Sequence, residues 1–231
     1  MNVRVLTTPR RTLALALTGL VLAALSPPTA ANPEPYSQAS KQHSPAQRLN
    51  QQVHRALERA RMGQAQAAMA SLQAVLDEQP EHHDARLLLA TMQAARGDLQ
   101  QAQTTLEQGL ATAPHHANLR MNLARVQMQA GQATQALETL ETGVTTQPTA
   151  DYRALYAVVL HAEGFPLRAT IQYALAIREQ PYNAQWLVGI AVSLHALGQV
   201  EAAREAFERA RNAPDFNRRL ADGVAQYGVI P

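Results

Sequence analysis

Small and apolar residues recur along the chain with a period of 34 residues. The stretches GQAQAAMASLQAVLDEQP from residue 63, GDLQQAQTTLEQGLATAP from residue 97 and GQATQALETLETGVTTQP from residue 131 carry glycine, alanine, an apolar residue and proline at matching positions. Two more stretches, 164–181 and 198–214, follow the same order with one residue of slippage. Position classes that share one period indicate internal structural repeats. The sequence therefore predicts five units between residues 49 and 214.

Each unit is expected to contain two helices. In the third unit, ANLRMNLARVQMQAG has apolar residues at helical spacing and ends at Gly131, where glycine provides a left-handed turn. The second helix, QATQALETLETGVTTQ, has a single apolar stripe, and Pro148 forbids its continuation. Ala124 and Ala136 let the two helices approach closely, and a larger residue there would overpack the contact by roughly 1–3 kcal/mol. The predicted fold class is an all-α solenoid.

These units resemble the tetratricopeptide repeat, a helix–turn–helix family with a small residue in each helix and a closing proline. The small residues that carry the resemblance are Ala56, Ala90, Ala124, Ala157 and Ala191 in the first helices and Ala68, Ala102, Ala136, Ala169 and Ala203 in the second helices. The resemblance implies one continuous superhelix of about five repeats over residues 49–214, stable only because its units stack.

Two flanking segments complete this part of the chain. Residues 215–231 place apolar side chains at helical spacing (Phe216, Leu220, Val224 and Tyr227) and are expected to form a capping helix over the last apolar face. Residues 32–48 begin with the polar, proline-containing stretch NPEPYSQASKQHS and are expected to be a flexible linker.

The first 31 residues have the layout of a secretory signal. A basic start, MNVRVLTTPRR, precedes a 14-residue apolar run (Thr12–Leu25) and the small residues of SPPTAA. The run is short for a membrane span, which needs about 20 apolar residues. The segment is therefore interpreted as a signal peptide cleaved after Ala31 or, alternatively, as an uncleaved N-terminal anchor. Both interpretations place the bulk of the chain outside the cytoplasm, in the periplasm.

Charge and cysteine content narrow the classes further. The formal net charge is +2, but residues 1–31 hold three arginines and no acidic residue, so the rest has a net charge of −1. Such a balance offers no basic surface for nucleic acid. Contact with a membrane is expected only if the N-terminal segment stays uncleaved. The chain has no cysteine, which excludes a lipoprotein anchor and disulfides.

The last 80 or so residues resemble the periplasmic repeat region of MSHA-type (type IV) pilus biogenesis proteins. The matching features are Asp151-Tyr152, the stretch QWLVGIAVSLHALG around Trp186, and EAAREAFERA before the terminal helix. The resemblance implies an interaction scaffold in pilus biogenesis. A scaffold for exopolysaccharide or cell-envelope assembly stays open as an alternative.

The ligand groove of the tetratricopeptide family is the concave surface lined by first helices. Carried over to this chain, the resemblance implies that a protein or peptide segment binds there. The implied groove residues are Leu87, Thr91, Met121, Arg125, Met128, Ala154, Val158, His161, Val188, Val192 and His195. Most are apolar, which suits a segment with hydrophobic anchors.

Histidines supply the other candidate chemistry. The pairs His82-His83 and His115-His116 occupy equivalent loops, and imidazole is a common metal ligand, but no carboxylate or thiolate pattern completes a site. We therefore expect no metal and no cofactor, with a histidine-based metal module as the weaker alternative. His161 and His195 have no legible nucleophile or carboxylate partner, so an enzyme is not expected. Trp186 is expected to pack at a unit boundary.

Overall fold

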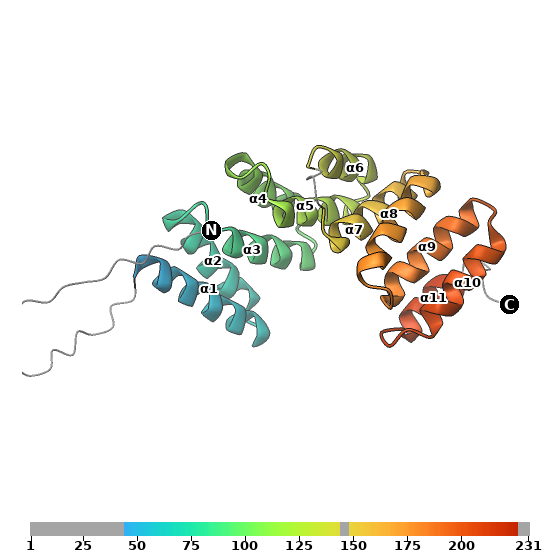
Figure 1. Ribbon diagram of the computed structural model, residues 1–231. Coiled ribbons are helices and arrows are strands. Elements are labelled where there is room, and N and C mark those ends of the chain that lie inside the picture. Colours follow the sequence, from blue (N-terminus) through green and yellow to red (C-terminus); the bar gives the residue numbers. More distant parts are fainter. Residues whose placement is uncertain (1–43, 144–147, 226–231) are drawn as a thin grey trace, which may run out of the picture. The chain divides into compact units, whose positions relative to one another are not determined.

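The computed structural model describes residues 44–143 and 148–225, which all belong to one compact unit. Within these ranges the chain forms eleven helices and no strand, which confirms the all-α prediction (Figure 1). In chain order they are α1 (Pro45–Arg61), α2 (Ala65–Glu78), α3 (His83–Ala95), α4 (Leu99–Thr112), α5 (Ala117–Gln129), α6 (Ala133–Glu141), α7 (Ala150–Ala162), α8 (Pro166–Glu179), α9 (Ala184–Ala196), α10 (Val200–Arg211) and α11 (Arg218–Ala225).

The predicted signal or anchor, residues 1–31, lies outside the described residues, as does the linker up to residue 43. Whether that segment is cleaved stays a prediction. Among the residues that are described, none of the helices combines the length and the apolarity that crossing a membrane requires.

The linker prediction is wrong for its last four residues, because α1 begins at Pro45 rather than at residue 49. Ser44 Oγ accepts a hydrogen bond from Gln47 N at 3.2 Å, and Ser44 N donates to Gln47 Oε1 at 2.8 Å. This reciprocal capping box, with proline in the first helical position, starts the helix there.

Helices pack in consecutive pairs, and the units are joined mainly through their first helices. Each first helix contacts the second helix of its own unit, as in α3 with α4 and α7 with α8. The first helices also contact one another in order, from α1 and α3 to α9 and α11. The stacking of helix pairs predicted from the 34-residue period is therefore confirmed.

Glycine and alanine occupy the positions that the repeat pattern assigned to them. The glycines that close the five first helices have φ between 73° and 86°, as at Gly131, where φ is 75°. Only glycine adopts this left-handed conformation without strain. The ten alanines of the two small-residue positions are each at most 1% exposed. These positions are therefore the close helix contacts that the sequence predicted.

A buried arginine that the sequence analysis did not single out holds the second unit together. Arg86, at the start of α3, donates to the carbonyl of Thr105 at 3.1 Å and to the carbonyl of Pro80 at 2.6 Å. A Cβ atom on Gly109 would lie 2.4 Å from Arg86 Cδ, so glycine makes room for the arginine stem. Arg120 makes the equivalent contacts 34 residues later.

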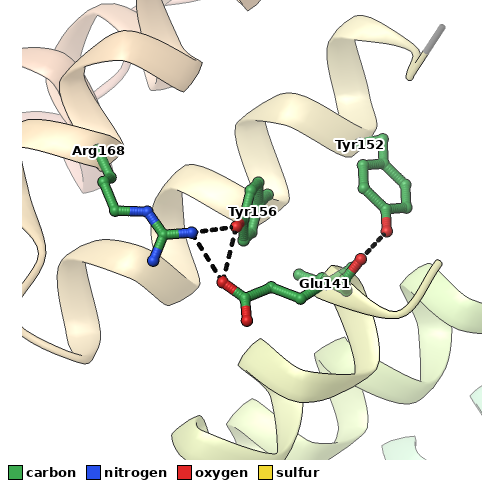
Figure 2. Close-up of polar contacts among 5 residues, drawn as sticks. Glu141, Tyr152, Tyr156 and Arg168 are labelled. Atoms are coloured by element: carbon green, nitrogen blue, oxygen red, sulfur yellow. Dashed lines mark hydrogen bonds and ion pairs between the residues drawn. The ribbon is translucent and has the colours of Figure 1, made fainter. Parts of the chain in front are cut away.

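The junction between the third and fourth units carries a polar cluster instead (Figure 2). Arg168 of α8 donates to Glu141 Oε1 at 2.7 Å and to the Tyr156 hydroxyl at 2.6 Å, and Tyr156 donates to Glu141 at 3.0 Å. Tyr152 donates to the Leu140 carbonyl. The hydrogen bond from Arg168 holds the pKa of Glu141 below its usual value. These bonds tie the end of α6 to α7 and α8.

The predicted capping helix is shorter than expected. Within the predicted range 215–231, α11 starts at Arg218, because Asn217 Oδ1 accepts a hydrogen bond from Leu220 N at 3.2 Å and caps it. Phe216 precedes the helix and packs edge-on against Phe207, with ring centroids 6.1 Å apart. Leu220 packs on the apolar core, whereas the side chains of Val224 and Tyr227 lie outside the described residues.

Candidate functional site

An open cavity of about 650 Å³ lies where α7, α9 and α11 meet. Its aliphatic lining comes from Val158 of α7, Val188 and Val192 of α9 and Leu220 of α11. Val158 is 41% exposed, an unusually open position for a valine. The polar residues at this cavity are His161, Tyr173, Gln185, Asp215, Asn217 and Arg219. The cavity thus combines an aliphatic wall with several hydrogen-bonding groups.

A second cavity of about 260 Å³ adjoins the first. The two share Val158, Tyr173 and Gln185, so they form one continuous hollow, which we call the α7–α9 groove. The second cavity adds Arg125 from α5 and Asp151 from α7. The groove therefore crosses three units and has one cation and one anion at its α5 side.

Tyr173 lies at the base of this groove, pressed against the backbone of α9. A Cβ atom on Gly189 would lie 2.3 Å from Tyr173 Cζ and 2.5 Å from its hydroxyl oxygen. Glycine in the middle of α9 therefore creates the notch that the tyrosine fills. Tyr173 is only 4% exposed although it lines both cavities, and burial raises the pKa of its hydroxyl. The phenol is accordingly neutral.

His161 stands beside it on α7 and is held by a serine of α9. Its Nδ1 lies 3.2 Å from Ser193 Oγ, and Ser193 Oγ donates to the Gly189 carbonyl at 2.9 Å. Because the serine proton is used for that carbonyl, His161 Nδ1 is the donor to Ser193, and Nε2 is left as an acceptor. Burial lowers the pKa of His161, which favours this neutral form.

The far end of the groove is fixed by a carboxylate. Asp215, between α10 and α11, accepts hydrogen bonds from Ala184 N through both of its oxygens, at 3.0 and 3.2 Å. Asn183 Oδ1 accepts from Trp186 N at 3.1 Å. Two side chains thus cap the N-terminus of α9, where backbone N–H groups lack helical partners. Asp215 therefore anchors the segment that carries α11 onto the groove.

The structure brings five of the predicted groove residues together. Val158, His161, Val188 and Val192 line the larger cavity, and Arg125 lines the smaller one. All five come from first helices, as the repeat resemblance implied. That they bind a partner stays a prediction.

The other predicted groove residues lie elsewhere. Met121 was wrongly assigned to the groove surface, because it is 6% exposed and belongs to the buried core cluster. Ala154 lines the smaller cavity but is 5% exposed. Leu87 and Met128 are half-buried against the core.

Two polar members of the predicted set are also outside the α7–α9 groove. Thr91 is exposed, and its hydroxyl donates to the Leu87 carbonyl at 2.7 Å within its own helix. His195 is half-buried, and in the described part of the chain its Nδ1 has no hydrogen-bond partner. A one-residue uncertainty in register changes which face of a helix a residue occupies, and this explains the mixed outcome.

Two of the four loop histidines act as helix caps. His82 Nδ1 accepts from Ala85 N, and His116 Nδ1 accepts from Leu119 N, both at 3.3 Å. The rings of His83 and His116 lie 4.5 Å apart at 60°. Within residues 44–143 and 148–225, no group of three or more potential ligands is positioned to hold a metal ion. Capping therefore accounts for His82 and His116 without a metal.

Trp186 is 7% exposed and belongs to the core cluster that joins the last units. Its predicted place at a unit boundary is confirmed.

Sequence models of the tetratricopeptide repeat match residues 59–113, 93–159 and 151–215. Together these matches cover well over half of the chain. The chain belongs to the tetratricopeptide repeat family. Repeats of this family form protein–protein interaction scaffolds and are generally non-enzymatic. No curated protein sequence matches the chain significantly.

Solved structures of tetratricopeptide repeat proteins share the fold. The crystal structure of MamA is 16% identical, with a TM-score of 0.60, over 78% of this chain and 94% of that one. MamA (41-end) from Desulfovibrio magneticus RS-1 is 17% identical, with a TM-score of 0.62, over 71% and 93%. YrrB is 19% identical, with a TM-score of 0.60, over 76% and 90%. At these identities the likeness concerns the fold alone.

The groove residues that the sequence analysis missed depart from the tetratricopeptide pattern of this chain itself. Tyr173 stands where other units have Leu72, Leu106, Leu140 and Phe207. Gly189 stands where the second, third and fourth units have Leu88, Asn122 and Leu155. Comparison of the units with one another would have marked both positions as unusual.

Proposed function

We propose that this tetratricopeptide repeat protein is an exported scaffold that holds a segment of a partner protein in the α7–α9 groove. The observation that carries the proposal is the convergence of Val158, Val188 and Val192 on one open cavity of about 650 Å³. Apolar side chains left open in a hollow are typical of surfaces that a partner covers. The groove crosses three units, which suits an extended segment or a short helix.

The polar groups around the valines favour a peptide over a wholly apolar ligand. Gln185, Asn217 and Asn183 line the groove with amides, which can both donate and accept hydrogen bonds to a peptide backbone. YrrB, which shares the fold, is described as having an unusual peptide-binding site. Both points support a protein or peptide segment as the occupant.

A binding role is also favoured over catalysis. Ser193 and His161 form the one pair in the groove that resembles a nucleophile and its base. However, Ser193 is 0% exposed and its hydroxyl donates to the Gly189 carbonyl, so a substrate cannot reach its oxygen. A nucleophile needs an accessible oxygen in hydrogen-bond reach of a base. We therefore propose that the protein is not an enzyme.

The location and the assembly belong to the same proposal. The basic start and the apolar run of residues 12–25 support export to the periplasm. The resemblance of the last 80 or so residues to MSHA-type pilus biogenesis proteins supports a type IV pilus assembly as the setting. The proposed partner is thus a pilus biogenesis protein of the cell envelope.

Affinity capture with matched variants tests the proposal. The chain from Asn32 onward is used as bait in envelope extract, beside Val158→Glu and Val200→Glu, and captured proteins are identified by mass spectrometry. Val200 is 48% exposed on α10, close to the 41% of Val158, and it lines no described cavity of the groove. Both variants therefore add the same charge at similar exposure, but only Val158→Glu alters the groove.

Pilus proteins captured by the native chain and by Val200→Glu, but lost with Val158→Glu, are the expected result. Capture of polysaccharide-synthesis proteins with the same dependence would keep the groove and overturn the pilus setting. Equal capture by all three baits would overturn the groove as the binding surface.

A further inference from the structure

The base of the α7–α9 groove carries a hydroxyl that the protein itself leaves unpaired. Tyr173 is 4% exposed, and its oxygen lies over the Gly189 notch, where a Cβ atom would be 2.5 Å away. In the part of the chain that the structure describes, no donor or acceptor forms a hydrogen bond with this hydroxyl. A buried hydroxyl without a partner costs about 1–3 kcal/mol. Such a group is therefore unexpected in a position that serves packing alone.

His161 supplies the complementary group. It lines the same cavity, and its Nδ1 is fixed by Ser193 Oγ at 3.2 Å. With the serine proton on the Gly189 carbonyl, the remaining ring nitrogen is a neutral acceptor. The base of the groove thus offers one donor, the Tyr173 hydroxyl, and one acceptor, His161 Nε2.

The same three positions are apolar in other units of this chain. Tyr173 replaces leucine or phenylalanine, and Ser193 stands where the second to fourth units have Met92, Val126 and Val159. His161 stands where the second and third units have Ala94 and Met128. A unit can therefore pack with apolar residues at these places. Packing does not require the hydroxyl, the imidazole and the serine that the last two units bring together.

We propose that Tyr173 and His161 form a polar subsite that binds the side-chain carboxamide of a glutamine or asparagine in the partner segment. The inference rests on the proposed function of the α7–α9 groove and names the group that the groove reads. A carboxamide has an oxygen for the Tyr173 hydroxyl and an N–H for His161, and it is neutral like both of them. The Asp215 carboxylate lines the same cavity and disfavours an acidic side chain. An aliphatic side chain would leave both polar groups unpaired.

Synthetic peptides provide the probe. A set of fluorescein-labelled nonapeptides keeps valine or leucine on both sides of one central residue, and that residue is glutamine, asparagine, methionine, leucine, glutamate or lysine. Glutamine and methionine have similar size and flexibility, so their affinity ratio isolates the carboxamide. The native chain is expected to bind the glutamine peptide about 10-fold more tightly, as two net hydrogen bonds imply.

Tyr173→Phe removes only the hydroxyl. We expect this variant to reduce the glutamine-over-methionine ratio to about 2-fold while its affinity for the methionine peptide stays unchanged. Tyr152→Phe is the matched control, because it removes a buried tyrosine hydroxyl that bonds the Leu140 carbonyl outside the groove. The control should keep the native ratio. Trp186 fluorescence confirms that each variant is folded.

Two results overturn the inference, and they can be told apart. Peptides that bind without a preference for glutamine over methionine, or a preference that survives Tyr173→Phe, overturn the carboxamide subsite and leave the groove standing. If the native chain binds none of the six peptides, the proposed function of the groove fails and the subsite fails with it.

Discussion

Gly189 and Tyr173 make one contact whose energy can be worked out and tested by substitution. Gly189 lies inside α9, where alanine is intrinsically favoured over glycine by about 1 kcal/mol. In the native chain, however, the new Cβ atom would lie 2.3 Å from Tyr173 Cζ. The tyrosine ring is rigid and 4% exposed, so it has to move or the helices have to separate.

The two effects oppose each other. Overpacking of a well-packed contact costs about 1–3 kcal/mol, so Gly189→Ala should lower the free energy of unfolding by about 1 kcal/mol net. In a Tyr173→Leu background the ring is absent, as it is at Leu106 and Leu140 of the earlier units. There the same substitution should raise the free energy of unfolding by about 1 kcal/mol, because only the helix preference remains. The effect of Gly189→Ala thus changes sign, with a coupling of about 2 kcal/mol.

Urea unfolding followed by Trp186 fluorescence measures this cycle. Trp186 is the chain's only tryptophan and lies on α9 itself, so it reports the unit that the substitution alters. This matters because stacked repeats can unfold in parts rather than in one step. Gly189→Ala effects of the same sign and size in both backgrounds would refute the steric explanation of the notch.

Three further predictions concern the scaffold. Ala136→Leu should lower the free energy of unfolding by about 1–3 kcal/mol, because Ala136 is 0% exposed at a helix contact, whereas Ala111→Leu, on an exposed part of α4, should change it by less than about 0.5 kcal/mol in urea unfolding. Arg86→Met should lower it by about 2–3 kcal/mol, since two backbone carbonyls lose a charged donor, and Arg55→Met at an exposed site is the control; equal effects of the two would contradict the clamp. Because burial lowers the pKa of His161 below 6.5, the unfolded chain binds more protons there, so stability should be full above pH 6.5 and fall as the pH drops below it. His161→Gln should flatten part of that fall in thermal melts between pH 7 and pH 5.

The repeat architecture was predictable because its determinants are local and recur. A glycine that must adopt positive φ, an alanine at a helix contact and a closing proline each have one physical reason, and the period of 34 multiplied that signal. The start of α1 was missed because a capping box at Ser44 is a short polar motif inside a polar stretch. The buried arginines were missed as well, although Arg86 and Arg120 share the period.

The groove was predictable only in part, because it depends on contacts between helices of different units. First-helix positions gave Val158, Val188 and Val192, since the face of each helix follows from its period. Met121 came from the same rule and proved buried, because one residue of register decides between surface and core. Tyr173 reaches the groove from a second helix through a glycine notch, and no periodicity of a single helix predicts such a contact.

The place of α11 links the groove to the weakest part of a stacked array. A terminal unit has a neighbour on one side only, so its helices open most readily. Here the last helix that the structure describes also walls the groove, and Asp215 fastens it to the start of α9. A segment bound in the groove must therefore hold α11 closed, since opening would remove part of its own binding surface. Occupancy and closure are thermodynamically linked, so the bound partner would act as the end piece of the array and protect it from local opening and proteolysis.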